Sequence, residues 1–188
     1  MIETDQVIRR ILRVDHAGEH GAVAIYSAQI ARAPAGKNDL LAWLQETLGH
    51  EQRHRDAFRA AMPSRAAKPC RALAVWSVGG RWLGRVSALF GTLGIMVCTA
   101  AVERTVHRHL VEQIAFLRRH DGELADIVCS ILSEEKEHLA FAEANHNDNG
   151  CFARLFSWMV SLTTELMILI STRGDSFRLK AVLRKASS

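Results

Sequence analysis

The chain has 188 residues, of which 48% are apolar, and its mean hydropathy is +0.01. This length suits one domain with a substantial core, while the hydropathy is too low for a chain that crosses a membrane many times. The net charge is +4, but the basic residues are spread out except in a tail at 174–188, and no nucleic-acid-binding motif is present, so we expect no nucleic acid partner.

The four cysteines, Cys70, Cys98, Cys129 and Cys151, form no Cys-x-x-Cys pair. This spacing argues against a zinc knuckle or a redox motif, and so few cysteines suit a reducing compartment. Charged, amphipathic sequence begins almost at once, so we see no signal peptide or mitochondrial leader. We therefore expect the protein to stay in the compartment where it is made.

Helical periodicity begins near the N-terminus. It predicts a helix over 5–32, a turn at 33–38 and a second helix over 39–61. A short basic segment with two prolines, 63–72, is expected to be the linker between two helical hairpins. We expect residues 1–188 to form a single domain.

From residue 73 the sequence becomes apolar and rich in glycine. Residues 86–102 contain no charged residue, which is close to the shortest length that can cross a bilayer. The run leads directly into Glu103, whose carboxylate would be costly in lipid unless it faced a bundle interior. We interpret the segment as a core helix with an apolar, membrane-facing entrance, continuing to about residue 120.

The last third of the chain predicts two more helices. A break at 121–122 precedes a helix over 123–145, and a strong turn signal follows at 147–150. The final helix, 152–171, is apolar apart from Glu165, and the basic tail comes after it.

Two Glu-x-x-His motifs occur within the predicted helices, at Glu51–His54 and Glu135–His138. Positions i and i+3 share one face of a helix, so the carboxylate and the imidazole can bind the same ion. A single motif of this kind is usually a surface pair. Ferritin-like di-iron bundles combine two such motifs with one glutamate from each of two other helices.

The two additional acids are present at matching positions. Glu19 precedes Glu51 by 32 residues, and Glu103 precedes Glu135 by the same interval. Each pair is centred on a predicted turn, so antiparallel helices would bring its members face to face. The sequence therefore predicts an all-α, ferritin-like four-helix bundle with additional apolar, membrane-associating helices.

The predicted metal ligands are Glu19, Glu51, His54, Glu103, Glu135 and His138. Mixed carboxylate and imidazole ligands suit iron or manganese, and the absence of thiolates argues against structural zinc. His109 lies six residues after Glu103, near the end of the bundle, and is a candidate for an electron or proton path. Asp15 and Asp56 are candidates for hydrogen bonds to the ligand imidazoles.

The segment 13–19, Arg-Val-Asp-His-Ala-Gly-Glu, resembles the opening signature of the demethoxyubiquinone hydroxylases, which are di-iron monooxygenases of ubiquinone biosynthesis. The motif at 51–54, the Cys-Thr-x-Ala-Val-Glu block at 98–103, and the second motif at 134–138 follow in the family's order. The resemblance extends over about residues 7–172. The first signature is specific, whereas Glu-x-x-His alone is not.

The resemblance implies O₂-dependent hydroxylation of the ring of a prenylated quinone, with two iron ions per chain and reduced nicotinamide (NADH) as the electron source. It implies that Glu51 and Glu135 bridge the irons and that Glu19 and Glu103 are terminal ligands. It also implies a peripheral position on a membrane, here the cytoplasmic face of a bacterial inner membrane. A lipid-binding accessory protein and an oligomer are candidate partners.

Three places depart from the family pattern. His20 stands where the family usually has tyrosine, and Leu110 replaces the tyrosine of a His-Tyr pair that begins at His109. In the last helix, Thr163–Thr164 and Ser171–Arg173 stand approximately where the family has Gly-Cys and Ser-Glu-Arg. These departures spare the ligands and bear on the electron path, the substrate pose and the ring carbon that is hydroxylated.

Two other functions fit parts of the sequence. A ferritin-like iron or peroxide-handling protein would need the same ligands without an organic substrate, but no apolar membrane face. A non-enzymatic, lipid-binding helical protein would need the apolar helices alone, and its acids would be incidental.

Overall fold

The computed structural model describes residues 4–34, 36–146 and 150–171, and the regular secondary structure within these residues is all helical. The elements are α1 (Thr4–Ile30), α2 (Asn38–Ala61), the 3₁₀ helix η1 (Pro63–Arg65), α3 (Leu73–Leu89), α4 (Gly91–His120), α5 (Gly122–Ala144) and α6 (Cys151–Ser171). The predicted all-α class is confirmed. The basic tail at 174–188 and most of the predicted turn at 147–150 lie outside the described residues.

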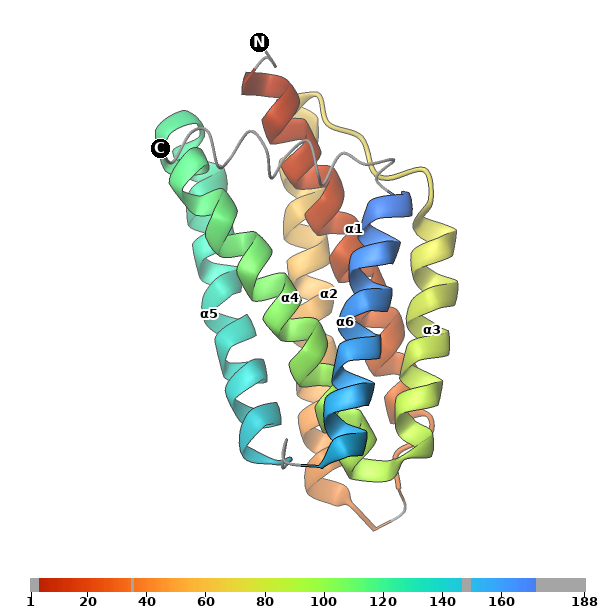
Figure 1. The fold of residues 1–188 in the computed structure, drawn as a ribbon. Helices are drawn as coiled ribbons and strands as arrows, with labels where there is room; N and C mark the ends of the chain where they lie inside the picture. The colour runs from red at the N-terminus through yellow and green to blue at the C-terminus, as the bar shows by residue number, and fades with distance from the viewer. Residues whose placement is uncertain (1–3, 35, 147–149, 172–188) are drawn as a thin grey trace.

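Helices α1, α2, α4 and α5 form a four-helix bundle of two hairpins, α1–α2 and α4–α5 (Figure 1). Helices α3 and α6 lie beside the bundle, where α3 packs on α1 and α6 packs on α4. Figure 1 shows these two helices next to each other, on the side of the molecule away from α5. The predicted bundle with two additional apolar helices is therefore present.

The apolar segment after residue 73 is two helices, so the prediction that it forms one core helix continuing to residue 120 was wrong. The chain turns between α3 and α4 at Gly91, whose φ of +63° lies in the left-handed region that side chains other than glycine rarely adopt. Because of this turn, α3 lies outside the bundle, while residues 94–103 of α4 are buried within it.

Helix α3 approaches α1 closely because its contact face is made of glycine. A Cβ atom at Gly80 would lie 2.5 Å from the carbonyl oxygen of Gly21, and one at Gly84 would lie 2.4 Å from that of Ile25. Both distances are shorter than van der Waals contact. Any larger side chain at either position would push α3 away from the bundle.

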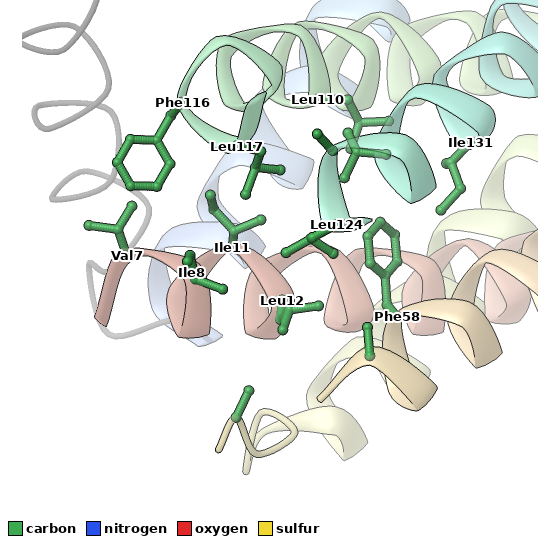
Figure 2. Close-up of a cluster of buried hydrophobic side chains, with 14 of the residues drawn as sticks. Val7, Ile8, Ile11, Leu12, Phe58, Leu110, Phe116, Leu117, Leu124 and Ile131 are labelled. Atoms are coloured by element: carbon green, nitrogen blue, oxygen red, sulfur yellow. The ribbon is translucent and has the colours of Figure 1, made fainter. Parts of the chain in front are cut away.

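Two apolar layers fill the bundle, one toward each end. The first joins the N-terminal half of α1 to the ends of α2, α4 and α5 that lie beside it, and Leu12, Phe58, Leu117 and Leu124 are at its centre (Figure 2). The second layer, around Tyr26, Leu44 and Met96, occupies the opposite half. The middle of the bundle, between these layers, is polar.

The α4–α5 turn is fixed by Asp121. Its carboxylate accepts a hydrogen bond from the backbone N–H of Leu124 and so caps α5. The same carboxylate accepts two hydrogen bonds from Arg65, at 2.6 and 2.8 Å, which tie η1 to this turn. The predicted break at 121–122 is thus present and sets the register of the second hairpin.

Candidate metal centre

The six predicted ligands meet in the middle of the bundle, between the two apolar layers. The four glutamates are at most 4% exposed and the two histidines are 3% exposed. Each hairpin contributes one glutamate from its first helix and a glutamate and a histidine, one turn apart, from its second. Because each set lies near the middle of its helix, antiparallel packing brings all six side chains to one level.

The six side chains form two overlapping groups of four. In each group, one ligand atom from every residue lies within 4.8 Å of the others. The first group is Glu19, Glu51, His54 and Glu135, and the second is Glu51, Glu103, Glu135 and His138. Glu51 and Glu135 belong to both groups, whereas each of the other four residues belongs to only one.

Both imidazoles direct Nδ1 into this cluster. His54 Nδ1 lies 3.1 Å from Glu135 Oε1, and His138 Nδ1 lies 3.5 Å from Glu51 Oε1. The Nε2 atoms point outward. His138 Nε2 is 2.9 Å from His50 Nδ1, and His54 Nε2 is 3.4 Å from a carboxylate oxygen of Glu134.

Burial and mutual repulsion raise the pKa values of three of the four carboxyl groups. The pKa of Glu19 is raised to about 8, mainly because the group is buried and because Glu135 is close. The pKa values of Glu51 and Glu103 are raised well above the ordinary value for the same two reasons. Glu135 behaves oppositely: burial would raise its pKa, but its close polar contacts with Glu103, His138 and His54 lower it.

Tyr26 donates a hydrogen bond of 2.6 Å to Glu103 Oε1. Together with His50 and Glu134, it orients a member of the cluster from outside, a role not predicted from the sequence. Tyr26 is the chain's single tyrosine and lies seven residues after Glu19, two helical turns along the same face of α1. That spacing is a signal that could have identified it.

The predicted hydrogen bonds, which Asp15 and Asp56 would accept from the ligand imidazoles, are absent from the described residues, so that prediction was wrong. Asp15 instead accepts a hydrogen bond of 2.8 Å from Gln113 Nε2. Asp56 is exposed and pairs with its neighbour Arg55. Helix geometry explains the difference for Asp56, because it lies two residues after His54 and so points to a different side of α2.

An apolar pocket opens directly onto the cluster. It includes about 750 Å³ of space free of protein atoms, part of which is open to solvent. Four cluster glutamates lie at its inner end, and its walls come from α1, α3, α4 and α6. Apolar wall residues include Ile25, Trp76, Leu83, Val102 and Met167.

The donor set fits two divalent cations. Four carboxylates carry four negative charges, which two such ions would neutralise. Four of the six cluster residues have buried side-chain atoms without a hydrogen-bond partner in the described chain, among them Glu51 Oε1, His54 Nδ1, Glu135 Oε2 and His138 Nδ1. Buried polar atoms are normally partnered, so these unpartnered atoms fit the role of metal ligands.

Comparison with known proteins identifies the group to which the chain is related. A family model described as "Ubiquinone biosynthesis protein COQ7" matches residues 6–171. This match covers most of the chain and includes all six cluster residues. The chain belongs to the COQ7 family.

Curated relatives agree with this membership. The NADPH-dependent 3-demethoxyubiquinone 3-hydroxylase of Dictyostelium discoideum is 33% identical over 171 residues, covering 89% of this chain and 78% of that protein. The 3-demethoxyubiquinol 3-hydroxylase of Rhodospirillum rubrum is 32% identical over 167 residues, with the same two coverages. The mouse relative, also named an NADPH-dependent 3-demethoxyubiquinone 3-hydroxylase, is 33% identical over 143 residues, and the chain spans 63% of its length. The resemblance found in the sequence is confirmed.

None of the described residues that depart from the family pattern belongs to the cluster, and two of them, Leu110 and Thr164, line the pocket. His20 Nε2 is 2.8 Å from Ser77 Oγ and so joins α1 to α3. Leu110 is buried in the apolar layer of Figure 2 and also lines the pocket, as does Thr164. Thr172 and Arg173 lie outside the described residues.

The raised carboxyl pKa values predict how the metal-free protein responds to pH. Folding raises these pKa values, so the folded chain holds protons more tightly than the unfolded chain, and stability falls as pH rises through the folded values. Three histidines have lowered pKa values in the folded chain: His16, His20 and His50. They are largely neutral above about pH 7 in both the folded and the unfolded chain, so they add little to the pH dependence of stability there. We expect the unfolding temperature of the metal-free chain to fall between about pH 7 and about pH 8.5.

Metal should reverse this trend, because a bound cation displaces the protons and binds more tightly as pH rises. Unfolding followed by circular dichroism, with and without Fe²⁺ under nitrogen, measures both slopes. A Glu103→Gln chain, which has one fewer titrating carboxyl group, should show a shallower fall without metal. Equal slopes with and without metal would contradict this account.

Proposed function

We propose that this chain is a di-iron monooxygenase that hydroxylates the ring of a prenylated demethoxyquinone in ubiquinone biosynthesis. The observation that carries the proposal is the meeting of two features: a buried cluster of four glutamates and two histidines, and an apolar pocket that ends at it. A protein that only stores iron or removes peroxide needs the cluster but not the pocket.

Glu19, Glu51, His54, Glu103, Glu135 and His138 would hold the two ions. Glu51 and Glu135 suit the bridging positions because each belongs to both groups of four. Bound iron would supply the redox chemistry that activates O₂. In the overall reaction, one oxygen atom becomes the new ring hydroxyl and the other becomes water, and a reduced nicotinamide supplies the two electrons.

The chain's own residues would hold the ring and exclude water. Leu83, Val102 and Leu110 line the pocket and are at most 6% exposed, so the inner end is shielded from solvent. Fixing a ring beside the reacting centre lowers the entropic part of the barrier. The apolar wall would favour a neutral ring with a prenyl tail over a charged metabolite.

His109 is the proposed proton or electron path. It lines the pocket, and its Nε2 lies 3.5 Å from Glu165 Oε1 on α6. The same carboxylate accepts a hydrogen bond from Arg108, which is exposed on α4. A line of polar groups therefore leads from the pocket to the surface.

The test is turnover by the iron-loaded chain with a demethoxyquinone, ¹⁸O₂ and either NADH or NADPH. We expect mass spectrometry to find a hydroxylated quinone that carries one ¹⁸O atom. A Glu135→Ala chain should lose this activity by about 1000-fold or more, because it lacks a ligand shared by both groups. Glu137→Ala changes an exposed acid two residues away and serves as the matched control.

Iron bound in full but no hydroxylated product from any demethoxyquinone would overturn the proposal. The comparison of NADH with NADPH also decides the electron source, since the names of several relatives specify NADPH.

We also propose that α3 and α6 lie on a membrane surface. Each carries a stripe of exposed apolar side chains at helical spacing, which includes Val78 and Trp82 on α3 and Leu155, Trp158 and Leu162 on α6. Phe90, at the α3–α4 turn, packs against Phe152 with a ring-centroid distance of 4.8 Å and connects the two stripes. Exposed apolar patches of this extent are typical of binding surfaces.

The inner faces of the same two helices line the pocket. The lining residues include Trp76, Leu83, Thr164 and Met167. A prenyl tail could therefore pass from the lipid into the pocket without crossing water. Helix α6 also has the length and hydropathy of a membrane span over Cys151–Leu169, and it is the one such helix among the described residues. Its ion pair with Arg108, through Glu165, favours a position on the surface over one across the bilayer.

Replacing both Trp82 and Trp158 by glutamate should weaken binding to vesicles that contain anionic lipid by about tenfold or more, since each tryptophan would otherwise bury apolar area in the interface. Co-sedimentation measures the binding. Val111→Glu is the matched control, because Val111 is 48% exposed but lies on α4 outside the two stripes. Equal binding by all three chains would exclude α3 and α6 as the membrane face.

Four finer points stay predictions. These are the cytoplasmic face of a bacterial inner membrane, a lipid-binding accessory protein, an oligomer, and the single-domain organisation with its linker at 63–72.

A further inference from the structure

One carboxylate that lines the pocket is not a member of the cluster. Among the carboxylates that line the pocket in the described chain, Asp15 alone belongs to neither group of four. Asp15 is 7% exposed and comes one helical turn before Glu19, on the same face of α1. Its position is therefore beside the cluster, along the wall that a bound ring would touch.

Asp15 is held by one of its two oxygens. Gln113, which is 1% exposed, donates from Nε2 to Asp15 Oδ1 at 2.8 Å and so ties α4 to α1. Asp15 Oδ2 is buried and has no hydrogen-bond partner in the described part of the chain. A buried, unpartnered carboxylate oxygen is costly, and it persists only where something else binds it or where the fold requires it.

The free oxygen suits one particular ligand group. An ionised carboxylate only accepts hydrogen bonds, so Oδ2 would bind a hydroxyl donor and would repel a carbonyl oxygen. A hydroquinone ring carries two hydroxyl groups, whereas the corresponding quinone carries two carbonyl groups. The two redox states of one substrate therefore differ at the atom that faces Asp15.

We propose that Asp15, held in place by Gln113, accepts a hydrogen bond from a ring hydroxyl and makes this pocket selective for the reduced quinol over the quinone. The inference rests on the proposed function for the identity of the ring, and it names the redox state that binds. Because one helical turn spans about 5.4 Å, a ring held at Asp15 would also reach the level of Glu19 and the cluster.

A purely structural role for Asp15 predicts something different. The bond to Gln113 could simply join α1 to α4, as the bond from Gln29 Nε2 to Ser87 Oγ joins α1 to α3. In that case, loss of the carboxylate would lower the unfolding temperature but would not change the ratio of quinol affinity to quinone affinity.

The experiment measures that ratio by isothermal titration calorimetry under nitrogen. The full chain is loaded with Zn²⁺, which has no redox chemistry, and kept at pH 8.5, above the Asp15 pKa of about 7. The two probes are a methoxy-methyl-benzoquinone with one prenyl unit and its quinol. We expect the wild-type chain to bind the quinol roughly tenfold or more tightly than the quinone, as one charge-assisted hydrogen bond implies.

Asp15→Ala should remove this preference by weakening quinol binding while quinone binding stays the same or becomes tighter. Asp15→Asn keeps the shape but not the charge, so it should reduce the preference, and it keeps the test usable if Asp15→Ala does not fold. Gln29→Met removes a buried hydrogen bond of the same helix outside the pocket and should leave the ratio unchanged.

A ratio that is the same in the wild-type chain and in a folded Asp15 variant would overturn the inference. Turnover of the iron-loaded chain is measured separately. Product formation with no effect of Asp15 on the ratio would leave the proposed function standing and reject this inference. Quinol-selective binding that depends on Asp15, without turnover, would support this inference and reject the proposed function.

Discussion

The repulsion among four buried carboxylates at the centre of the bundle is the constraint on which the rest of the structure depends. Two carboxylates about 4 Å apart repel each other by roughly 4 kcal/mol even at an effective dielectric constant of 20. Protons relieve this repulsion in the metal-free chain, which is why burial and neighbouring charge raise the pKa values of Glu19, Glu51 and Glu103. Two divalent cations would relieve it more completely, because they also bind the oxygens and imidazole nitrogens that lack partners.

The architecture follows from the need to hold these groups together. Apolar layers on both sides of the cluster supply the burial that stabilises the bundle, and the two turns set the register that brings the glutamates to one level. Helices α3 and α6 then wall the pocket on the side where the cluster is accessible. Because α3 lies against α1 through Gly80 and Gly84, the pocket wall stays close to Glu19. The outward faces of the same helices carry exposed apolar side chains.

The cluster could be predicted from the sequence because its information is local. Each Glu-x-x-His lies within one helical turn, and the equal 32-residue intervals together with the turns at 33–38 and 121–122 determine the pairing of helices. Tyr26 could have been added by the same helical spacing. The division of residues 73–120 into two helices was harder to predict. Five glycines could each have ended a helix there: Gly79, Gly80, Gly84, Gly91 and Gly94. Only the packing selects Gly91. The Asp15–Gln113 bond joins residues 98 positions apart, so no local pattern indicates it.

The most direct test of the two-ion centre is the stoichiometry of Fe²⁺ bound to the metal-free chain, titrated under nitrogen and measured by elemental analysis after gel filtration. The account predicts two ions per chain, and a loss of both in Glu51→Ala, because Glu51 belongs to both groups of four. Gln52→Ala, which changes the exposed neighbour, should keep both. One ion per chain, or two ions retained by Glu51→Ala, would contradict it.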